Sequence, residues 1–125
     1  MKSKLLKNIH LIISILIVIP IGVIYGFCPD LLFDVKINSV DEANILGAIM
    51  GLYLAFAMLW ILGIFKTEYW KAATISMMLF MLGLGFGRII SILHDGIPSM
   101  IFLAGTVGEL ILGFYASYQL KFYRI

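Results

Sequence analysis

Charged residues are scarce in this chain. Of its 125 residues, 13% are Asp, Glu, Lys or Arg, whereas 62% are hydrophobic, and the mean hydropathy is +1.08. A small soluble domain needs far more charge than this to stay dispersed in water. The composition therefore excludes a soluble domain and predicts a protein whose partner is the lipid bilayer.

Cysteine is nearly absent as well. Cys28 is the only one, so the chain has neither an intramolecular disulfide nor a C-x-x-C redox pair. The two histidines, His10 and His94, are expected at opposite faces of the membrane, and only His94 with Asp95 could supply metal ligands together. These absences argue against a thiol oxidoreductase and against a metal site. We predict no cofactor and no nucleic-acid partner.

The chain is instead rich in long apolar runs. There are four of them, at residues 9–27, 43–65, 72–93 and 100–120. The first two hold no charged residue, the third holds only Arg88 and the fourth only Glu109. Each run is close to the roughly 20 residues that an α-helix needs to cross about 30 Å of hydrocarbon. Because the backbone must satisfy its own hydrogen bonds in lipid, the runs predict helices rather than strands.

We therefore predict an all-α fold, an integral membrane bundle of four transmembrane helices. It is expected to form one domain over residues 1–125, with helices at about 9–29, 43–65, 71–93 and 100–120. Seven basic residues lie at the two termini and in the second connection: Lys2, Lys4, Lys7, Lys66, Lys71, Lys121 and Arg124. The first connection has only Lys36 among four acidic residues. By the positive-inside rule, both termini are cytoplasmic and the protein is a multi-pass protein of the inner (plasma) membrane.

Glycines recur at four- or eight-residue spacing in the last three runs. The pairs are Gly47 with Gly51, Gly83 with Gly87, and Gly105 with Gly113. Small residues on one stripe of a helix let two helix backbones approach closely. We predict close packing within this bundle, with a homodimer seam as the alternative.

Arg88 and Glu109 are the two charges inside the spans. Arg88 lies six residues before His94, roughly 9 Å below the outer boundary, and Glu109 lies near the midplane, roughly 16 Å deep. The short connection between the third and fourth runs makes their helices antiparallel neighbours. An unpaired charge near the bilayer centre costs at least about 2.5 to 3.5 kcal/mol. We therefore predict that Arg88 pairs with Glu109 inside the bundle, through a charge-assisted hydrogen bond.

Helical spacing adds candidate ligand-binding residues to this pair. Ser91 and Asp95 share the face of Arg88, and Asn44 and Tyr53 lie on the second helix at depths that reach toward the midplane. The polar groups thus concentrate in the outer half of the bundle, and the inner half is expected to be Leu, Ile, Met and Phe. This asymmetry predicts a cavity open to the outside, covered by the acidic connection at residues 30–42. In simpler readings Asn44 only caps the second helix, and Asp95 only belongs to a turn.

The same residues carry a family resemblance. They are Asn44, Gly51-Leu52-Tyr53, Gly87-Arg88, Ser91, Asp95-Gly96, Pro98 and Glu109. This pattern resembles a family of small bacterial four-helix membrane proteins known only as a domain of unknown function, and the likeness covers about the last two thirds of the chain. The resemblance implies the four-helix fold and no activity. That family often has an arginine where this chain has Gly47, so a second cationic ligand group is not implied.

Several functions remain open from the sequence. The first is a non-enzymatic bundle that binds or transports a small polar, anionic or lipid-like ligand at Arg88 and Glu109. The second is a membrane enzyme acting on a lipid or isoprenoid-like substrate, with Glu109 as acid or base. The third is an accessory subunit of a membrane complex, which needs no site at all. For the pair itself, the alternative to a ligand site is a structural clamp that fixes helix register. A homo-oligomer or a membrane-protein partner also stays open. The lack of nucleophile elbows, metal clusters and phosphate loops favours binding over catalysis.

Overall fold

The structure, a computed structural model, describes residues 2–123, with side chains from residue 3 onward. Four long helices make up almost all of it: α1 (Lys2–Phe27), α2 (Val40–Phe65), α3 (Thr67–Asp95) and α4 (Met100–Phe122), with a short 3-10 helix, η1 (Pro29–Leu31), after α1. There is no strand among residues 2–123. All four helices are long and apolar enough to cross a bilayer. The predicted all-α transmembrane bundle is confirmed.

Three of the four helices, α1, α2 and α3, begin earlier in the sequence than predicted, whereas α4 begins at Met100 as predicted. Lysine is a good helix former, so α1 already includes the basic residues that precede the apolar run. Helix α2 begins at Val40 because Ser39 caps it: the Ser39 hydroxyl accepts a hydrogen bond from the Glu42 amide at 3.1 Å. The Glu42 carboxylate in turn accepts from the Asn38 amide at 2.9 Å. Asn44 therefore lies inside the helix, and the prediction that it caps α2 is wrong.

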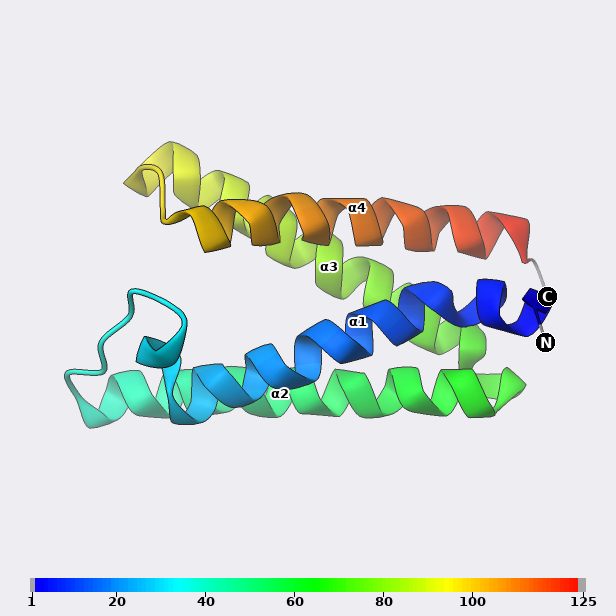
Figure 1. The fold of residues 1–125 in the computed structure, drawn as a ribbon, viewed down its shortest axis with the longest axis horizontal. Coiled ribbons are helices and arrows are strands. Elements are labelled where there is room, and N and C mark those ends of the chain that lie inside the picture. The colour runs from blue at the N-terminus through cyan, green and yellow to red at the C-terminus, as the bar shows by residue number, and fades with distance from the viewer. Residues whose placement is uncertain (1, 124–125) are drawn as a thin grey trace.

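The four helices run alternately up and down (Figure 1). The start of α1, the α2–α3 turn and the end of α4 lie at one end of the bundle, which we call the terminal end. Residues 28–39 and the α3–α4 connection at residues 96–99 lie at the opposite, distal end. Arg124 of the basic tail and the side chain of Lys2 lie outside the described residues.

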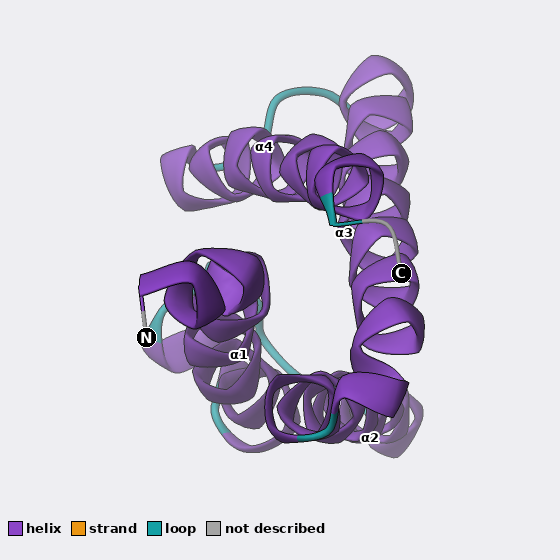
Figure 2. Cartoon of the chain, turned by 90° about the vertical axis from the view of Figure 1, so that its right-hand side faces the viewer, coloured by secondary structure: helices purple, strands orange, loops and turns teal. Residues whose placement is uncertain are grey.

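The bundle consists of two helix hairpins joined along one side. Helix α1 packs beside α2, α2 beside α3, and α3 beside α4, whereas α1 has few contacts with α4. Figure 2 shows this arrangement end on, with α3 joining α2 to α4 and with α1 and α4 facing one another on the other side. Figure 1 shows that α1 and α4 are close at the terminal end and diverge toward the distal end. The divergence leaves room for a site in the distal half.

Glycines do allow close helix contacts, but mostly not the ones predicted. A Cβ added at Gly22, Gly85 or Gly113 would collide with a side chain of the neighbouring helix. A Cβ at any of five predicted stripe positions would meet nothing within 4 Å: Gly47, Gly51, Gly83, Gly87 and Gly105. The prediction of close packing is therefore wrong at those five positions and correct at Gly113. Glycine spacing puts these residues on one face of a helix but does not say whether that face contacts another helix. Where the helices diverge, it does not.

Candidate functional site

Arg88 and Glu109 form an ion pair between α3 and α4. The Arg88 Nε donates to Glu109 Oε1 at 2.8 Å, and the two side chains are 24% and 13% exposed. Gly96 ends α3 with a φ of 108°, a conformation that favours glycine, and the chain then turns back into α4. The turn makes α3 and α4 antiparallel neighbours, as the sequence predicted. The predicted pairing of Arg88 with Glu109 is confirmed.

Tyr25 is a third member of this site and comes from α1. Its hydroxyl oxygen accepts a hydrogen bond from Arg88 Nη2 at 3.3 Å, and the residue is 9% exposed. Tyr25 is not among the site residues predicted from the sequence. It lies two residues before the end of α1, at the same end of the bundle as Arg88. A similar depth in the membrane is therefore the one sequence feature that links Tyr25 to Arg88. The guanidinium thus joins the two hairpins.

A column of aromatic rings covers the site on its distal side. Phe33, in the segment after η1, is 5% exposed and stacks between Tyr25, at 5.0 Å between ring centroids, and Phe102 of α4, at 4.9 Å. The Arg88 guanidinium carbon lies 5.3 Å from the Phe102 ring centroid, a cation–π distance. The segment between α1 and α2 therefore packs over the distal mouth of the bundle through Phe33, as predicted.

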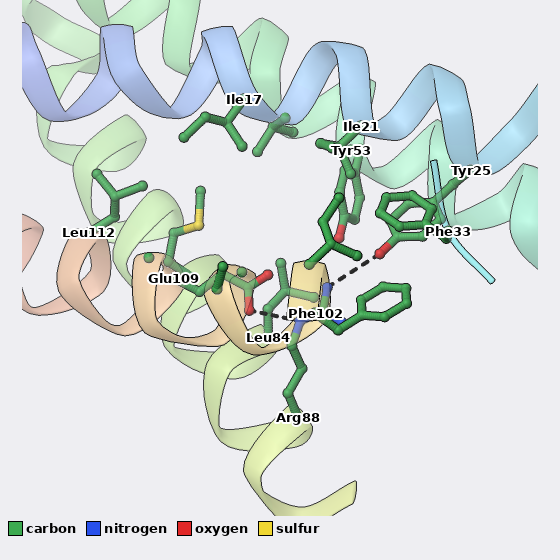
Figure 3. Close-up of a pocket in the computed structure, with 16 residues that line it drawn as sticks. Ile17, Ile21, Tyr25, Phe33, Tyr53, Leu84, Arg88, Phe102, Glu109 and Leu112 are labelled. Atoms are coloured by element: carbon green, nitrogen blue, oxygen red, sulfur yellow. Dashed lines mark hydrogen bonds and ion pairs between the residues drawn. The ribbon is translucent and has the colours of Figure 1, made fainter. Parts of the chain in front are cut away.

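A cavity of about 330 Å³ lies beside the ion pair, between α1, α3 and α4 (Figure 3). Its polar lining consists of Arg88, Glu109, Tyr25 and Tyr53, which lie together toward one end. The remaining lining is apolar, and includes Ile17, Ile21, Leu84 and Leu112. The cavity therefore offers a group of polar side chains toward one end within otherwise apolar walls.

A second, more open space reaches Arg88 from another side. This groove of about 800 Å³ lies between α2 and α3, and Tyr25, Tyr53, Arg88 and Ser91 are among its lining residues. Gly83 and Gly87, which have no side chains to fill it, also line it. Arg88, Tyr25 and Tyr53 line both spaces, so the guanidinium is reached both from the cavity and from the α2–α3 face.

Comparison with known proteins identifies the family of this chain but does not indicate an activity. The family model of a domain of unknown function, DUF4345, matches residues 6–120, which is nearly the whole chain. The chain belongs to the DUF4345 family. No curated protein and no solved structure matches it. The expected membership of a family of unknown function is confirmed. The geometry of the site is therefore the basis for a functional proposal for this DUF4345 chain.

Only some of the predicted site residues of this DUF4345 chain reach the ion pair. Tyr53 lines the cavity, is 5% exposed and meets Tyr25 edge to face at 5.6 Å. Ser91 lines the groove, but its hydroxyl donates to Asp95 at 2.9 Å rather than to the pair. Asp95 also contacts His94 Nδ1 at 2.6 Å and is exposed at the end of α3. It shares a helical face with Arg88, but it lies beyond the part of α3 that lines the cavity.

Asn44 is likewise not brought to the site. It is exposed near the distal start of α2 and lines neither the cavity nor the groove. The distal parts of α2 and α3 diverge (Figure 1), so a residue at this level of α2 lies away from Arg88. The prediction that Asn44 belongs to the site is therefore not supported by its position.

The terminal half of the DUF4345 bundle holds buried polar residues, contrary to the prediction of an apolar inner half. His10 is 0% exposed, and its Nε2 is 2.9 Å from the Thr74 hydroxyl on α3. Gln119 is 2% exposed, and its Nε2 donates to the Leu6 carbonyl at 2.7 Å. Ser14, one turn along α1 from His10, is also fully buried. Polar side chains are tolerated between membrane helices when they form hydrogen bonds across the interface. His10 and Gln119 do so, joining α1 to α3 and α4, whereas the Ser14 hydroxyl has no partner among the described residues.

Proposed function

We propose that this protein binds an amphipathic, lipid-like molecule inside the membrane, with the polar head of the ligand at Arg88 and its apolar body in the cavity. The observation that carries the proposal is the position of Arg88 at the polar end of an otherwise apolar cavity. Intramembrane ionisable residues are functional candidates because their burial is costly. Non-enzymatic binding requires only the groups already present.

The guanidinium has hydrogen-bonding capacity left for such a ligand. An arginine has five N–H donors, and within residues 2–123 two of them have a partner, Nε with Glu109 and one Nη2 hydrogen with Tyr25. A polar group that is removed from water and has no partner costs free energy. A ligand carbonyl, hydroxyl or carboxylate oxygen at the remaining donors would remove this cost.

The size and lining of the cavity support a lipid-like ligand. Small-molecule sites commonly have volumes of about 300 to 1,000 Å³ and mostly apolar walls, and this cavity has about 330 Å³. Glu109 already neutralises Arg88, so the remaining donors of the guanidinium can bind an uncharged hydroxyl head group as well as a carboxylate. A tail that continues past Leu112 or Ile17 would run between α1 and α4, where the two helices have few contacts.

The charge distribution supports an orientation with both termini in the cytoplasm. Five lysines of the described part are at the terminal end: Lys4, Lys7, Lys66, Lys71 and Lys121. The distal connection and the first turn of α2 carry Lys36 together with Asp30, Asp34, Asp41 and Glu42. In a plasma membrane the positive-inside rule then puts the ion pair in the outer half of the bilayer. A fluorescent protein fused to the C-terminus should fluoresce. A reporter enzyme that is active only outside the cytoplasm should be inactive when it is fused to the same end.

Ligand binding is tested by native mass spectrometry of the delipidated full chain, titrated with oleate and with oleyl alcohol. We expect one bound molecule per chain, and Arg88→Gln should weaken binding at least about tenfold, because a hydrogen bond to a charged group contributes about 1.5 to 3 kcal/mol. Asp95→Asn is the matched control, since it removes an exposed carboxylate of the same helix outside the cavity. Equal binding by Arg88→Gln and Asp95→Asn would contradict the proposal.

The competing structural role has its own signature. If Arg88→Gln and Glu109→Gln each fail to fold, and the double variant folds and binds both probes as the wild type does, the pair is only a clamp. Loss of binding by the folded double variant supports a ligand site. The comparison of the two probes identifies the preferred head group as a carboxylate or a hydroxyl.

A further inference from the structure

A separate cavity of about 330 Å³ opens at the terminal end of the bundle, far from the ion pair. It lies between the start of α1, the end of α2, the start of α3 and the end of α4. The residues that give it chemical character are Lys4, Lys7, Asn8, Thr67, Trp70 and Tyr123. None of its lining residues is acidic, so the cavity is basic.

Lys4 and Lys7 bring two positive charges to the same face of α1. Residues three apart on a helix are neighbours, and like charges so placed repel each other. Among the described residues, neither lysine is in an ion pair. An anion in the cavity would remove this repulsion.

Trp70 holds Lys7 at the edge of the cavity. The Trp70 Nε1 donates to the Lys7 carbonyl at 3.3 Å, and Lys7 Nζ lies 5.1 Å from the Trp70 ring centroid. Trp70 is 2% exposed, so its position is fixed by packing. Both the backbone and the ammonium group of Lys7 are therefore oriented before any ligand binds.

Asn8 supplies a buried polar side chain that has no partner. It is 4% exposed, it lines the cavity, and its Oδ1 has no hydrogen-bond partner among residues 2–123. An unpartnered amide oxygen would repel an anion, so anion binding requires the Asn8 amide to turn and present its N–H₂ group, which donates. Thr67, the first residue of α3, also lines the cavity, and no side chain caps this helix end. The N–H groups of a helix N-terminus favour negative charge.

We propose that this terminal cavity binds a phosphate group, held by the ammonium groups of Lys4 and Lys7 and by the side-chain amide of Asn8. The phosphate could come from a lipid head group or from free phosphate. The surroundings favour the lipid, because Trp70 and Tyr123 are residues typical of the membrane interface and the flanking Leu5 and Leu6 are more than half exposed. The proposal does not depend on the site at Arg88.

The test uses the full chain in an uncharged detergent and native mass spectrometry. The probes are phosphatidylglycerol, phosphatidylcholine and inorganic phosphate. We expect Lys4→Gln/Lys7→Gln to weaken phosphatidylglycerol binding at least about tenfold. The matched control Lys71→Gln/Lys121→Gln removes the same charge at the same end outside the cavity, and should change binding less than about twofold.

A second pair of variants tests the amide without changing charge. Asn8→Leu should weaken phosphatidylglycerol binding several-fold, whereas Asn44→Leu, at an exposed asparagine of the distal end, should not. Displacement of the lipid by inorganic phosphate at similar concentration would identify free phosphate as the ligand; displacement only at a large excess would identify the lipid. Equal losses in the two lysine double variants, or no binding of any probe, would overturn the proposal.

Discussion

Arg88 of α3 donates a hydrogen bond to the hydroxyl of Tyr25 on α1 at 3.3 Å, across the space between the two helix hairpins. The same guanidinium is paired with Glu109 on α4 at 2.8 Å. One side chain therefore connects three helices, and it does so where α1 and α4 diverge. The cavity beside it exists because these helices are joined at a few points in the distal half rather than packed along their length.

Replacing Tyr25 with phenylalanine should lower stability and leave the fold unchanged. The change removes the hydroxyl that accepts from the charged Arg88 guanidinium but keeps the ring that stacks on Phe33, so the expected loss is about 1.5 to 3 kcal/mol in the free energy of unfolding. Denaturant unfolding in detergent micelles measures it. Tyr118→Phe, at an exposed tyrosine of α4, is the control and should have no effect. A Tyr25→Phe variant as stable as the control would show that this bond contributes nothing.

Phe33→Ala should uncover the distal side of the cavity. The ring of Phe33 is buried between Tyr25 and Phe102, and truncation of a buried phenylalanine costs about 3 to 5 kcal/mol. We expect lower stability together with faster exchange of oleate, measured by stopped-flow fluorescence with a labelled fatty acid. Phe27→Ala, at a ring that is 75% exposed, should change neither. Unchanged exchange in folded Phe33→Ala would refute its role as a cover.

His10 and Thr74 should be energetically coupled although they are 64 residues apart in the sequence. A double-mutant cycle with His10→Ala and Thr74→Val isolates their interaction. Hydrogen bonds between membrane helices average about 0.6 kcal/mol and reach about 1.7 kcal/mol, which is the range expected here. The pair His94→Ala and Thr74→Val, whose members lie at opposite ends of α3, should show additive effects. Additivity in the His10 cycle would be inconsistent with the bond.

Gly113→Ala should destabilise the α3–α4 contact. A Cβ there lies 2.7 Å from Leu82 Cγ and 3.2 Å from the Leu82 backbone nitrogen, and overpacking typically costs about 1 to 3 kcal/mol. Gly51→Ala is the matched control because its Cβ meets nothing within 4 Å. Thermal unfolding in one detergent compares the two variants. A Gly113→Ala variant at least as stable as Gly51→Ala would mean that the helices separate easily.

The sequence predicts the fold and the central pair well because strong physical constraints act on both. Lipid demands long apolar helices, and it demands that Arg88 find Glu109 when a short connection makes their helices neighbours. No comparable constraint identifies Tyr25, since an uncharged tyrosine near a helix end is as acceptable at the membrane interface as in a core. Tyr25 contacts Arg88 only because of how the α1–α2 hairpin is placed relative to the α3–α4 hairpin.

Asp95 and Asn44 are predicted site residues that lie away from the ion pair. Helical spacing puts Asp95 on the face of Arg88, but it is exposed at the end of α3. Depth puts Asn44 at a plausible level, but it is exposed near the start of α2, where α2 and α3 diverge (Figure 1). His10 and His94 lie toward opposite ends of the bundle, as expected, but His10 is fully buried because it packs against Thr74 of α3. These positions depend on the angles between the helices, and a local sequence pattern carries no information about those angles.

The most direct test of the central claim, that a lipid-like ligand occupies the distal cavity, is to fill that cavity and measure oleate binding by native mass spectrometry. Gly105 lines the cavity, and an added Cβ there meets nothing within 4 Å, so we expect Gly105→Leu to extend into this space. Gly51→Leu, which points outside the cavity, is the control. The proposed site predicts that folded Gly105→Leu loses bound oleate while Gly51→Leu retains it; equal binding by the two variants would contradict it.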